Sequence, residues 1–374
     1  MALAVGDNVF VSQHIGDLET HQSLEAFRAV ERDLQALYDH QPVVVVCDMH
    51  PDYFSSKEAK RRGGEVVEIQ HHFAHVLSCM AENELSGEVL GVSWDGTGYG
   101  PDGTVWGGEF LVSDGSEFGR VACLKPFRLP GAERAVKEPR RSAAGLLFEI
   151  FGDEAFRNRE QRPFSEFTIA ELSVLHQMLR RGVNAPRTSS VGRLFDAVAS
   201  LVGLRQQNNF EGQAAMELEF ALAGETSEQS YRCDVRQFDD KTEDDIVSPQ
   251  GASYRPRYVV DWSAMIEGII TDVRRCVPVS LLSKKFHNAL VGAIVEVAEK
   301  VGIPRVVLTG GCFQNQFLTE RCVKRLQAAG FQAYWHQRVP PNDGGISLGQ
   351  AYAALLMGRR LNLSERQSQG EVGK

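Results

Sequence analysis

The amino-acid sequence predicts an α/β fold, because short apolar runs typical of buried strands alternate with helical patterns. Strands are predicted at 43–46, 89–94 and 305–309, and the segment 105–113 is predicted to return beside 89–94 as a hairpin. Helices are predicted at 284–301, 315–329 and 346–356. The polar, acidic stretch 224–257 is predicted to be an exposed excursion.

The composition is that of a globular protein with a sizeable core. The chain has 374 residues, of which 43% are apolar, and 40 Lys and Arg against 49 Asp and Glu give a net charge of −9. An acidic chain is a poor nucleic-acid or anionic-membrane binder, since such binders present basic patches. The sequence shows no transmembrane run and no secretory leader, and its seven cysteines fit a reducing compartment. We therefore expect a cytoplasmic protein.

We expect four regions along the chain. Two lobes are predicted at 1–117 and 191–357, the second ending in a closing helix. Between them, 118–190 is rich in turns and charges and is predicted to be an insertion of short helices and loops. Residues 358–374 lack apolar periodicity and are predicted to be a flexible tail.

The segment 70–77 carries the most informative pattern. On a helix, His71 and His75 would project from one face with Cβ atoms about 5–6 Å apart, close enough to share a metal ion. His72 would point about 100° away, and Cys79 would lie roughly 12 Å along the axis from His71. Histidines that line a polar surface would give the same pattern, so further ligands are needed.

Two aspartates are candidates for those further ligands. Asp95 follows a predicted buried strand, and Asp343 precedes the last predicted helix. Two imidazoles and two carboxylates with an open position suit Fe(II), Zn(II) or Mn(II) better than a closed structural zinc site. Because Asp-Gly is also a common turn pair, turn formation alone would account for each aspartate.

Glycine-rich segments suggest a place for a nucleotide. Asp95, Gly96, Thr97 and Gly98 follow one predicted strand, and Gly310 and Gly311 follow another, with Asn315 opening the next helix. Glycine allows close backbone approach to a phosphate, and helix N-termini favour anions. Two such loops fit the cleft of a two-lobed ATP-binding fold, although tight strand–helix turns would also explain them.

Asp196 and the basic run at 137–141 are further candidates for substrate contacts. Asp196 on a predicted helix could accept hydrogen bonds from ribose hydroxyls, with Gly212 allowing the sugar close. The basic run at 137–141 could hold a carbamoyl or carboxylate oxygen through a guanidinium. A solvated surface charge is the alternative in each case.

Taken together and in this order, the segments resemble one family. They are SQHIGDL at 12–18, CDMHPDYFS at 47–55, HHFAH at 71–75, DGTGYG at 95–100, WGGE at 106–109, GRLFD at 192–196, GGCFQN at 310–315 and NDGGISLGQ at 342–350. This set resembles the carboxy-terminal, TsaD-like domain of the hydrogenase maturation carbamoyltransferase HypF, over about residues 3–356.

The resemblance implies a two-lobed actin-like ATPase (ASKHA, TsaD-like) fold that binds carbamoyladenylate or ATP/AMP and a divalent metal, Fe or Zn. It implies carbamoyl transfer to the C-terminal cysteine thiolate of HypE, on the route to the cyanide ligands of NiFe hydrogenase. Residue by residue, it implies metal ligation by His71, His75, Asp95 and Asp343, and nucleotide contacts by Asp196, Gly212, Gly311 and Asn315. Lys137 and Arg141 stand at the family's basic motif and are the candidate catalytic side chains.

Whole HypF proteins also carry an adenylate-forming part, and we expect this chain to lack it. Carbamoyladenylate would then come from elsewhere, for example from a separate adenylate-forming domain acting in trans. Two alternatives remain open at this point. One is a TsaD-type tRNA threonylcarbamoyl transferase, which the net charge of −9 disfavours. The other is a non-catalytic nucleotide-binding scaffold.

Overall fold

A mixed sheet of nine strands lies at the centre of the molecule. The structure is a computed structural model and describes all residues except 19, 158, 160–161, 240–253 and 372–374. The continuous path of the sheet runs, in spatial order, through β10 (Asp234–Gln237), β11 (Tyr258–Asp261), β7 (Phe118–Leu124), β6 (Val105–Ser113), β5 (Val89–Tyr99), β12 (Arg305–Thr309) and β13 (Gln332–Trp335). The short strands β8 (Phe127–Arg128) and β9 (Arg187–Thr188) pair beside β6.

Helices cover both faces of this sheet. They include α3 (His71–Glu82), α7 (Val191–Leu201), α10 (Val279–Val301), α11 (Gln316–Ala328) and α12 (Ile346–Glu371). Because successive strand residues point to opposite faces, Leu90 packs with α7 and α10 in one core, and its neighbour Val89 packs with α3 in a second core. The carboxyl half of β5 therefore lies between α3 and α7.

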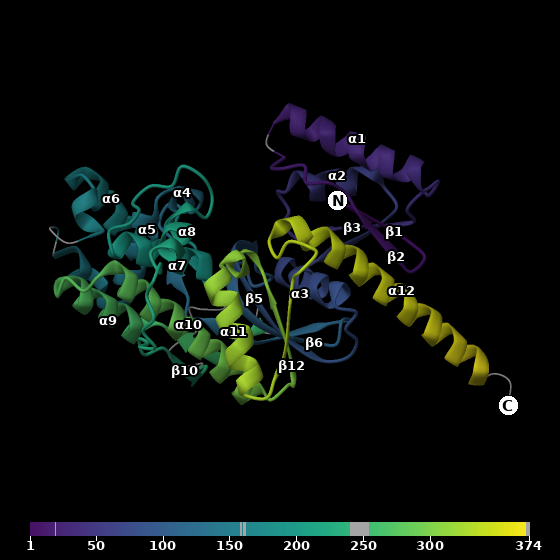
Figure 1. Cartoon of the computed structure of the whole chain (residues 1–374). Coiled ribbons are helices and arrows are strands. Elements are labelled where there is room, and N and C mark those ends of the chain that lie inside the picture. The colour runs from purple at the N-terminus through teal and green to yellow at the C-terminus, as the bar shows by residue number, and fades with distance from the viewer. Residues whose placement is uncertain (19, 158, 160–161, 240–253, 372–374) are drawn as a thin grey trace.

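The first part of the chain forms its own small unit beside α12 (Figure 1). Its elements are β1 (Ala2–Val5), β2 (Asn8–Val11), α1 (His21–Leu37), β3 (Val44–Asp48), α2 (Phe54–Arg62) and β4 (Glu65–Ile69). β1 pairs with β2 and β3 pairs with β4, and neither pair joins the central sheet. β4 leads directly into α3, so this unit adjoins the helix that carries the paired histidines.

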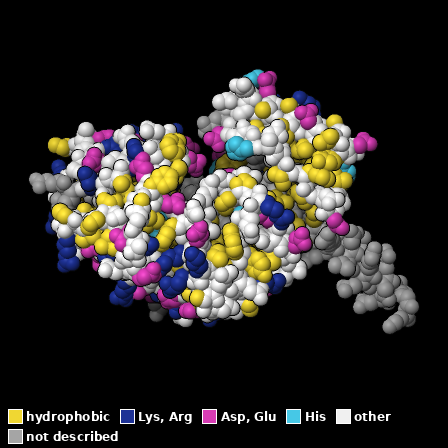
Figure 2. All heavy atoms as spheres, in the orientation of Figure 1, with side chains coloured by type: hydrophobic (Ala, Val, Ile, Leu, Met, Phe, Trp, Pro, Cys, Tyr) yellow, Lys and Arg dark blue, Asp and Glu magenta, His cyan; other side chains and the backbone are white. Residues whose placement is uncertain are grey.

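The remaining helices gather at the opposite end of the molecule (Figure 1). They are α4 (Glu133–Lys137), α5 (Pro139–Phe151), α6 (Ile169–Arg181), α8 (Gln213–Phe220) and α9 (Ser263–Arg274), with the short turns η1 (Gly152–Arg157) and η2 (Phe164–Glu166). Figure 2 shows an indentation between this end and the N-terminal unit. Two further turns, η5 (Gly311–Gln314) and η6 (Asp343–Gly345), follow β12 and precede α12.

The structure confirms the α/β class and most of the predicted elements. The strand at 305–309 and the hairpin of β5 with β6 are present, and each predicted helix is found with shifts at its ends. One expectation about β5 was wrong. Residues 95–99 do not form a turn after the strand but belong to β5, because Gly98 and Tyr99 pair with β6 again after a register irregularity between Trp94 and Gly98.

The strands of the central sheet come from three of the four predicted regions of the chain. β5 and β6 precede position 118, β7 to β9 fall within the predicted insertion, and β10 to β13 follow it, yet all belong to one sheet. Helix α12 extends to Glu371 and so runs through most of the segment 358–374. Residues 372–374, and 240–253 of the expected acidic excursion, lie outside the described residues.

Within the part of the chain that the structure describes, no helix combines the length and apolar character that crossing a bilayer requires.

Candidate metal centre

Helix α3 places His71 and His75 side by side, as their spacing predicts. Gln70 caps the helix, and its side chain accepts a hydrogen bond from the Phe73 amide at 2.8 Å. The two imidazoles are 1% exposed, with ring centroids 5.0 Å apart. Two buried imidazoles at the start of one rigid helix make a fixed pair of nitrogen donors.

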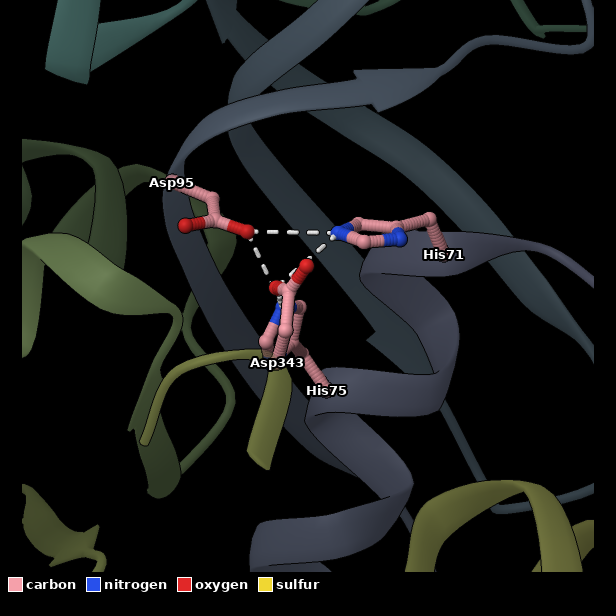
Figure 3. A group of neighbouring side chains, drawn as sticks. All are labelled: His71, His75, Asp95 and Asp343. Atoms are coloured by element: carbon pink, nitrogen blue, oxygen red, sulfur yellow. Dashed lines mark hydrogen bonds and ion pairs between the residues drawn. The ribbon is translucent and has the colours of Figure 1, made fainter. Parts of the chain in front are cut away.

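Asp95 and Asp343 complete a cluster with these histidines (Figure 3). Oδ2 of Asp95, on β5, lies 3.2 Å from Nε2 of His71 and 3.0 Å from Nε2 of His75. Oδ1 of Asp343, on the turn η6, lies 3.6 and 3.5 Å from the same two nitrogens. Asp95 is buried, whereas the Asp343 side chain is 68% exposed, so the cluster opens to solvent on the side of Asp343.

The cluster favours positive charge at its centre. Burial alone would lower the pKa of His71, but Asp343, Asp48 and Asp95 raise it well above its ordinary value. Burial alone would raise the pKa of Asp95, but His71 and His75 hold it well below its usual range. Two carboxylates facing two imidazoles therefore stabilise either protons or a bound cation.

Asp48 at the end of β3 orients His71 and was not among the predicted site residues. Its Oδ2 lies 2.9 Å from Nδ1 of His71, and its Oδ1 accepts a hydrogen bond from the His50 amide at 2.7 Å. A carboxylate on Nδ1 fixes the imidazole so that Nε2 is presented to the cluster. The sequence signal was available, because the predicted strand at 43–46 is followed by Cys47 and then Asp48.

The four side chains fit a divalent metal ion by their donor atoms. One ligand atom from each of His71, His75, Asp95 and Asp343 lies within 4.8 Å of the others. Two nitrogen and two carboxylate donors, without a thiolate, suit Zn(II), Fe(II) or Mn(II). With Asp48 behind His71, the arrangement has both a ligand set and an outer partner that orients it.

Of the two glycines at 96 and 98, Gly98 is packed closely against this cluster. A Cβ atom on Gly98 would lie 2.5 Å from Cε1 of His72 and 2.7 Å from Cδ2 of His71, so only glycine fits against the two imidazoles. Gly96 has more room, because its nearest neighbour for a Cβ would be Glu211 Oε1 at 3.6 Å. Thr97 lies between them on β5, and among the described residues its side chain is not one of the cluster's ligand candidates.

The turn after β12 also reaches the cluster. The Gly311 amide donates a hydrogen bond to Oδ1 of Asp95 at 3.0 Å, while a Cβ on Gly310 would lie 2.2 Å from the Trp94 carbonyl oxygen. Asn315 caps α11, accepting from the Leu318 amide at 2.8 Å, and its Nδ2 lies 2.9 Å from Nε2 of His287. The predicted glycine-rich segments thus meet at Asp95.

A second group of polar side chains lies on α7, next to this junction. Ser190, the N-cap of α7, donates to the Asp95 carbonyl oxygen at 3.0 Å and so fastens the helix to β5. Asp196 is 1% exposed and forms an ion pair of 3.1 Å with Nη2 of Arg193. Burial raises the pKa of Asp196 to about 6, against the opposing effect of Arg193.

This second group retains unused hydrogen-bonding capacity. Among the described residues, neither oxygen of Asp196, nor Nε or Nη1 of Arg193, nor Oδ1 of Asn208 has a hydrogen-bond partner. Buried polar groups without partners are rare in proteins and indicate a missing ligand or water. Gly212 follows Asn208 by four residues and is the N-cap of α8, with φ 75°. Burial raises the pKa of the preceding residue, Glu211.

The basic run at 137–141 packs against the same loop. The Lys137 carbonyl oxygen accepts from the Asn208 amide at 2.8 Å. Arg141 is 7% exposed, and its Nε donates to Glu138 at 3.0 Å, while Arg140 also pairs with Glu138 at 2.8 Å. Glu138 therefore balances part of this charge, and a catalytic role of Lys137 and Arg141 stays a prediction.

The segment WGGE forms a buried network behind the site, which the sequence did not assign. Arg120 donates to Glu109 at 2.7 Å and to Asp102 at 3.2 Å, and the Trp106 indole donates to Asp102 at 3.0 Å. Ser189 also donates to Glu109. Because Ser189 precedes the cap of α7, this network fixes the start of that helix.

Comparison with known proteins gives consistent matches over almost the whole chain. The family model described as "Carbamoyltransferase, Kae1-like Domain, second subdomain" matches residues 91–350, and the one described as "HypF Kae1-like domain" matches residues 1–82. The chain is similar to carbamoyltransferase HypF of Synechocystis sp., at 39% identity over 368 residues, 95% of this chain and 46% of the relative. It is also similar to the carbamoyltransferase HypF homolog of Cupriavidus necator, at 33% identity over 93% of this chain and 87% of the relative.

Two solved structures resemble the chain in fold. A crystal structure of full-length HypF in the phosphate- and nucleotide-bound form gives a TM-score of 0.82 and 39% identity, over 92% of this chain and 52% of that chain. The crystal structure of HypF from T. kodakarensis gives a TM-score of 0.82 and 25% identity, over 96% and 46% respectively. The chain thus spans about half the length of the full HypF proteins that it matches.

Proposed function

We propose a function from one established premise, which is that the chain belongs to the carbamoyltransferase HypF family through its Kae1-like region. In this proposal the chain transfers a carbamoyl group from carbamoyladenylate to the C-terminal cysteine thiolate of HypE. The modified thiol is then a precursor of the cyanide ligands of NiFe hydrogenase. Its cleft holds one divalent metal ion, Fe or Zn, next to the nucleotide.

One observation carries this proposal: the cluster of possible metal ligands and the buried pair Arg193–Asp196 are joined by a single hydrogen bond, from Ser190 to Asp95. His71, His75, Asp95 and Asp343 bring their donor atoms within 4.8 Å of one another. Ser190 bonds to the Asp95 carbonyl oxygen and caps the helix that carries Arg193 and Asp196. A ligand with a phosphate and hydroxyl groups could reach both.

The transfer balances without a nucleophile from this chain. The partner's thiolate attacks the carbamoyl carbon, a carbon–sulfur bond forms, and the bond to the phosphate oxygen breaks with AMP leaving as the anion. A divalent ion in the cluster would supply Lewis-acid stabilisation of the oxygen that gains negative charge. Cys312 is unsuited as an alternative nucleophile, because its burial and, to a smaller extent, the negative charge of Asp95 raise the pKa of its thiol well above the ordinary value.

The chain's own residues then bind and orient the adenylate. Asp196 accepts hydrogen bonds from the ribose, which gives its buried oxygens the partners that they lack in the protein alone. Gly212, Gly311 and Asn315 border the nucleotide. Lys137, whose carbonyl oxygen accepts from the Asn208 amide, and Arg141 approach its carbamoyl end. The carbamoyladenylate itself is supplied by an adenylate-forming domain, which can act in trans.

Mass spectrometry of a HypE C-terminal peptide tests this function. The peptide is incubated with the chain, Zn²⁺ or Fe²⁺ and carbamoyladenylate, beside His75→Ala and the control His21→Ala, whose side chain is 85% exposed on α1. We expect carbamoylation of the terminal cysteine by the wild type and the control, and none by His75→Ala. Nucleotide and metal binding without any modified peptide would contradict transfer and indicate a scaffold.

A further inference from the structure

The loop that carries Asp343 is attached to the helix that carries the histidines through one buried glutamate. Glu82 is the last residue of α3, and its side chain is 3% exposed. Its Oε1 accepts hydrogen bonds from three successive backbone amides, those of Gln337 at 2.9 Å, Arg338, and Val339 at 3.3 Å. One carboxylate oxygen therefore holds the whole start of the loop.

The other atoms of Glu82 extend this attachment. Oε2 accepts from Nδ1 of His336 at 2.8 Å, and the Glu82 carbonyl oxygen accepts from the Arg338 guanidinium. Nε2 of His336 lies 2.9 Å from the Thr309 hydroxyl, which also lies within hydrogen-bond distance of the His75 carbonyl oxygen, at 3.1 Å. The contacts of Glu82 thus lead back to the backbone of a metal-ligand histidine.

A second contact closes the loop at its far end. Ser78, one turn before Glu82 on α3, donates to the Gly345 carbonyl oxygen at 2.8 Å. Between the two attachments, the Pro341 carbonyl oxygen accepts from the Gly310 amide at 3.0 Å. The segment 336–345 is consequently fixed to α3 at both ends, with Asp343 between them.

Asp343 depends on this loop more than the other three ligands depend on their surroundings. His71, His75 and Asp95 are buried on a helix and a central strand, whereas the Asp343 side chain is 68% exposed on a three-residue turn. An exposed side chain on a short turn takes its position from the backbone that carries it. The loop backbone, in turn, is held at its start by Glu82 and at its end by Ser78.

We propose that Glu82 is a positioning residue for the metal centre, which sets the distance of Asp343 from His71 and His75 by fixing the loop 336–345 to α3. The proposal rests on the metal-binding role proposed above and goes beyond it, because it assigns a function to a residue outside the ligand set. Glu82 lies seven residues beyond His75, about 10 Å along the helix, and so acts through the loop and not as a ligand.

Three variants separate this role from general stability. Glu82→Met keeps a side chain of similar length but removes both carboxylate oxygens, and Glu82→Gln keeps one oxygen for the amides. Glu58→Met is the matched control, because Glu58 is likewise nearly buried (8% exposed) but pairs with Arg28 and Arg61, away from the loop. Circular dichroism and thermal unfolding show whether each variant is folded.

Metal affinity, measured with Co²⁺ against a chromophoric chelator, is the main readout. We expect Glu82→Met to raise the dissociation constant roughly tenfold, as loss of an outer-shell partner does, Glu82→Gln to raise it less, and the control to leave it unchanged. In an Asp343→Ala background, Glu82→Met should change it less than about twofold, because the two residues act together. An equal loss in both backgrounds would overturn the proposal.

Hydrogen exchange gives a test that needs no metal. In Glu82→Met, the amides of Gln337, Arg338 and Val339 should lose protection while those in the middle of α3 keep theirs. Unchanged protection would overturn the proposal even if the metal affinity fell. If the wild type bound no Co²⁺, the metal centre itself would be refuted, and this exchange pattern would still decide whether Glu82 holds the loop.

Discussion

The two halves of the candidate site differ in how complete they are without a ligand. On the side of α3, both nitrogens of His71 and both oxygens of Asp95 have partners within the protein. On the side of α7, Asp196 and Arg193 form an ion pair of 3.1 Å, but among the described residues neither oxygen of Asp196 and neither Nε nor Nη1 of Arg193 has a hydrogen-bond partner. The first half is preassembled by the fold, whereas the second leaves buried polar atoms without hydrogen-bond partners among the described residues.

The difference follows from charge and from the elements that carry each half. The α3 side gathers groups of opposite charge, so each stabilises the other even in the absence of an ion. The α7 side pairs Asp196 with Arg193 but buries both, and burial outweighs the ion pair enough to raise the pKa of Asp196 to about 6. In the function proposed above, the substrate supplies the contacts that the α7 side lacks.

The largest expected effect tests the preassembled half directly. His75→Ala removes one of two imidazole donors that α3 holds in place, so we expect loss of stoichiometric metal binding. Metal content after gel filtration, measured by atomic emission, checks this. Full occupancy in His75→Ala would show that the cluster is not the metal centre.

A smaller loss of metal affinity is expected from a change at Asp48, which contacts His71 but is not one of the four candidate ligands. Asp48→Asn keeps the size of the side chain but removes the charge behind Nδ1 of His71, 2.9 Å away. Loss of such a partner costs about 10- to 100-fold in metal affinity, and titration with a competing chelator measures it. An affinity equal to that of the wild type would mean that α3 alone orients His71.

The glycines at 96 and 98 give a matched pair of substitutions. Gly98→Ala places a Cβ 2.5 Å from His72 and should destabilise the fold by about 1–3 kcal/mol, with weaker metal binding. Gly96→Ala has 3.6 Å to its nearest neighbour and should have little effect on either. Chemical denaturation of the two variants checks the contrast, which equal effects would contradict.

The incomplete half should respond to pH. The pKa of Asp196 is about 6 in the folded protein, above its ordinary 3.8, so the stability linked to its protonated form is present below about pH 4 and lost as the pH rises through 6. Asp196→Asn removes this loss and should stabilise the ligand-free protein above pH 6 by at most about 3 kcal/mol. The same change should weaken ATP binding, and greater stability with undiminished binding would exclude Asp196 from the nucleotide site.

The same contrast explains what could be predicted from the sequence. His71 and His75 were recognisable because residues four apart on a helix lie on the same face. β12 was recognisable because a short run of β-branched residues is typical of a buried strand. Asp95 and Asp343 could be named by the family resemblance, but only the fold shows that the strand and the turn bring them to one point.

The remaining features depend on tertiary contacts that carry no local signal. In the sequence, Glu82 looks like an ordinary acidic residue at a helix end. Only the structure shows that the loop from His336 to Val339 binds its carboxylate. Residues 95–99 were expected to form a turn because Asp-Gly pairs favour turns, but pairing with β6 continues the strand. The orphaned polar atoms of Arg193 and Asp196 likewise become visible only with burial.

Anomalous diffraction from crystals of the chain grown with Zn²⁺ tests the central claim most directly. The account predicts one strong peak at the zinc edge, between Nε2 of His71, Nε2 of His75 and the carboxylates of Asp95 and Asp343. The peak should disappear in His75→Ala crystals. A wild-type map with no peak among these four side chains, or with zinc bound elsewhere, would contradict the assignment of this cluster as the metal centre.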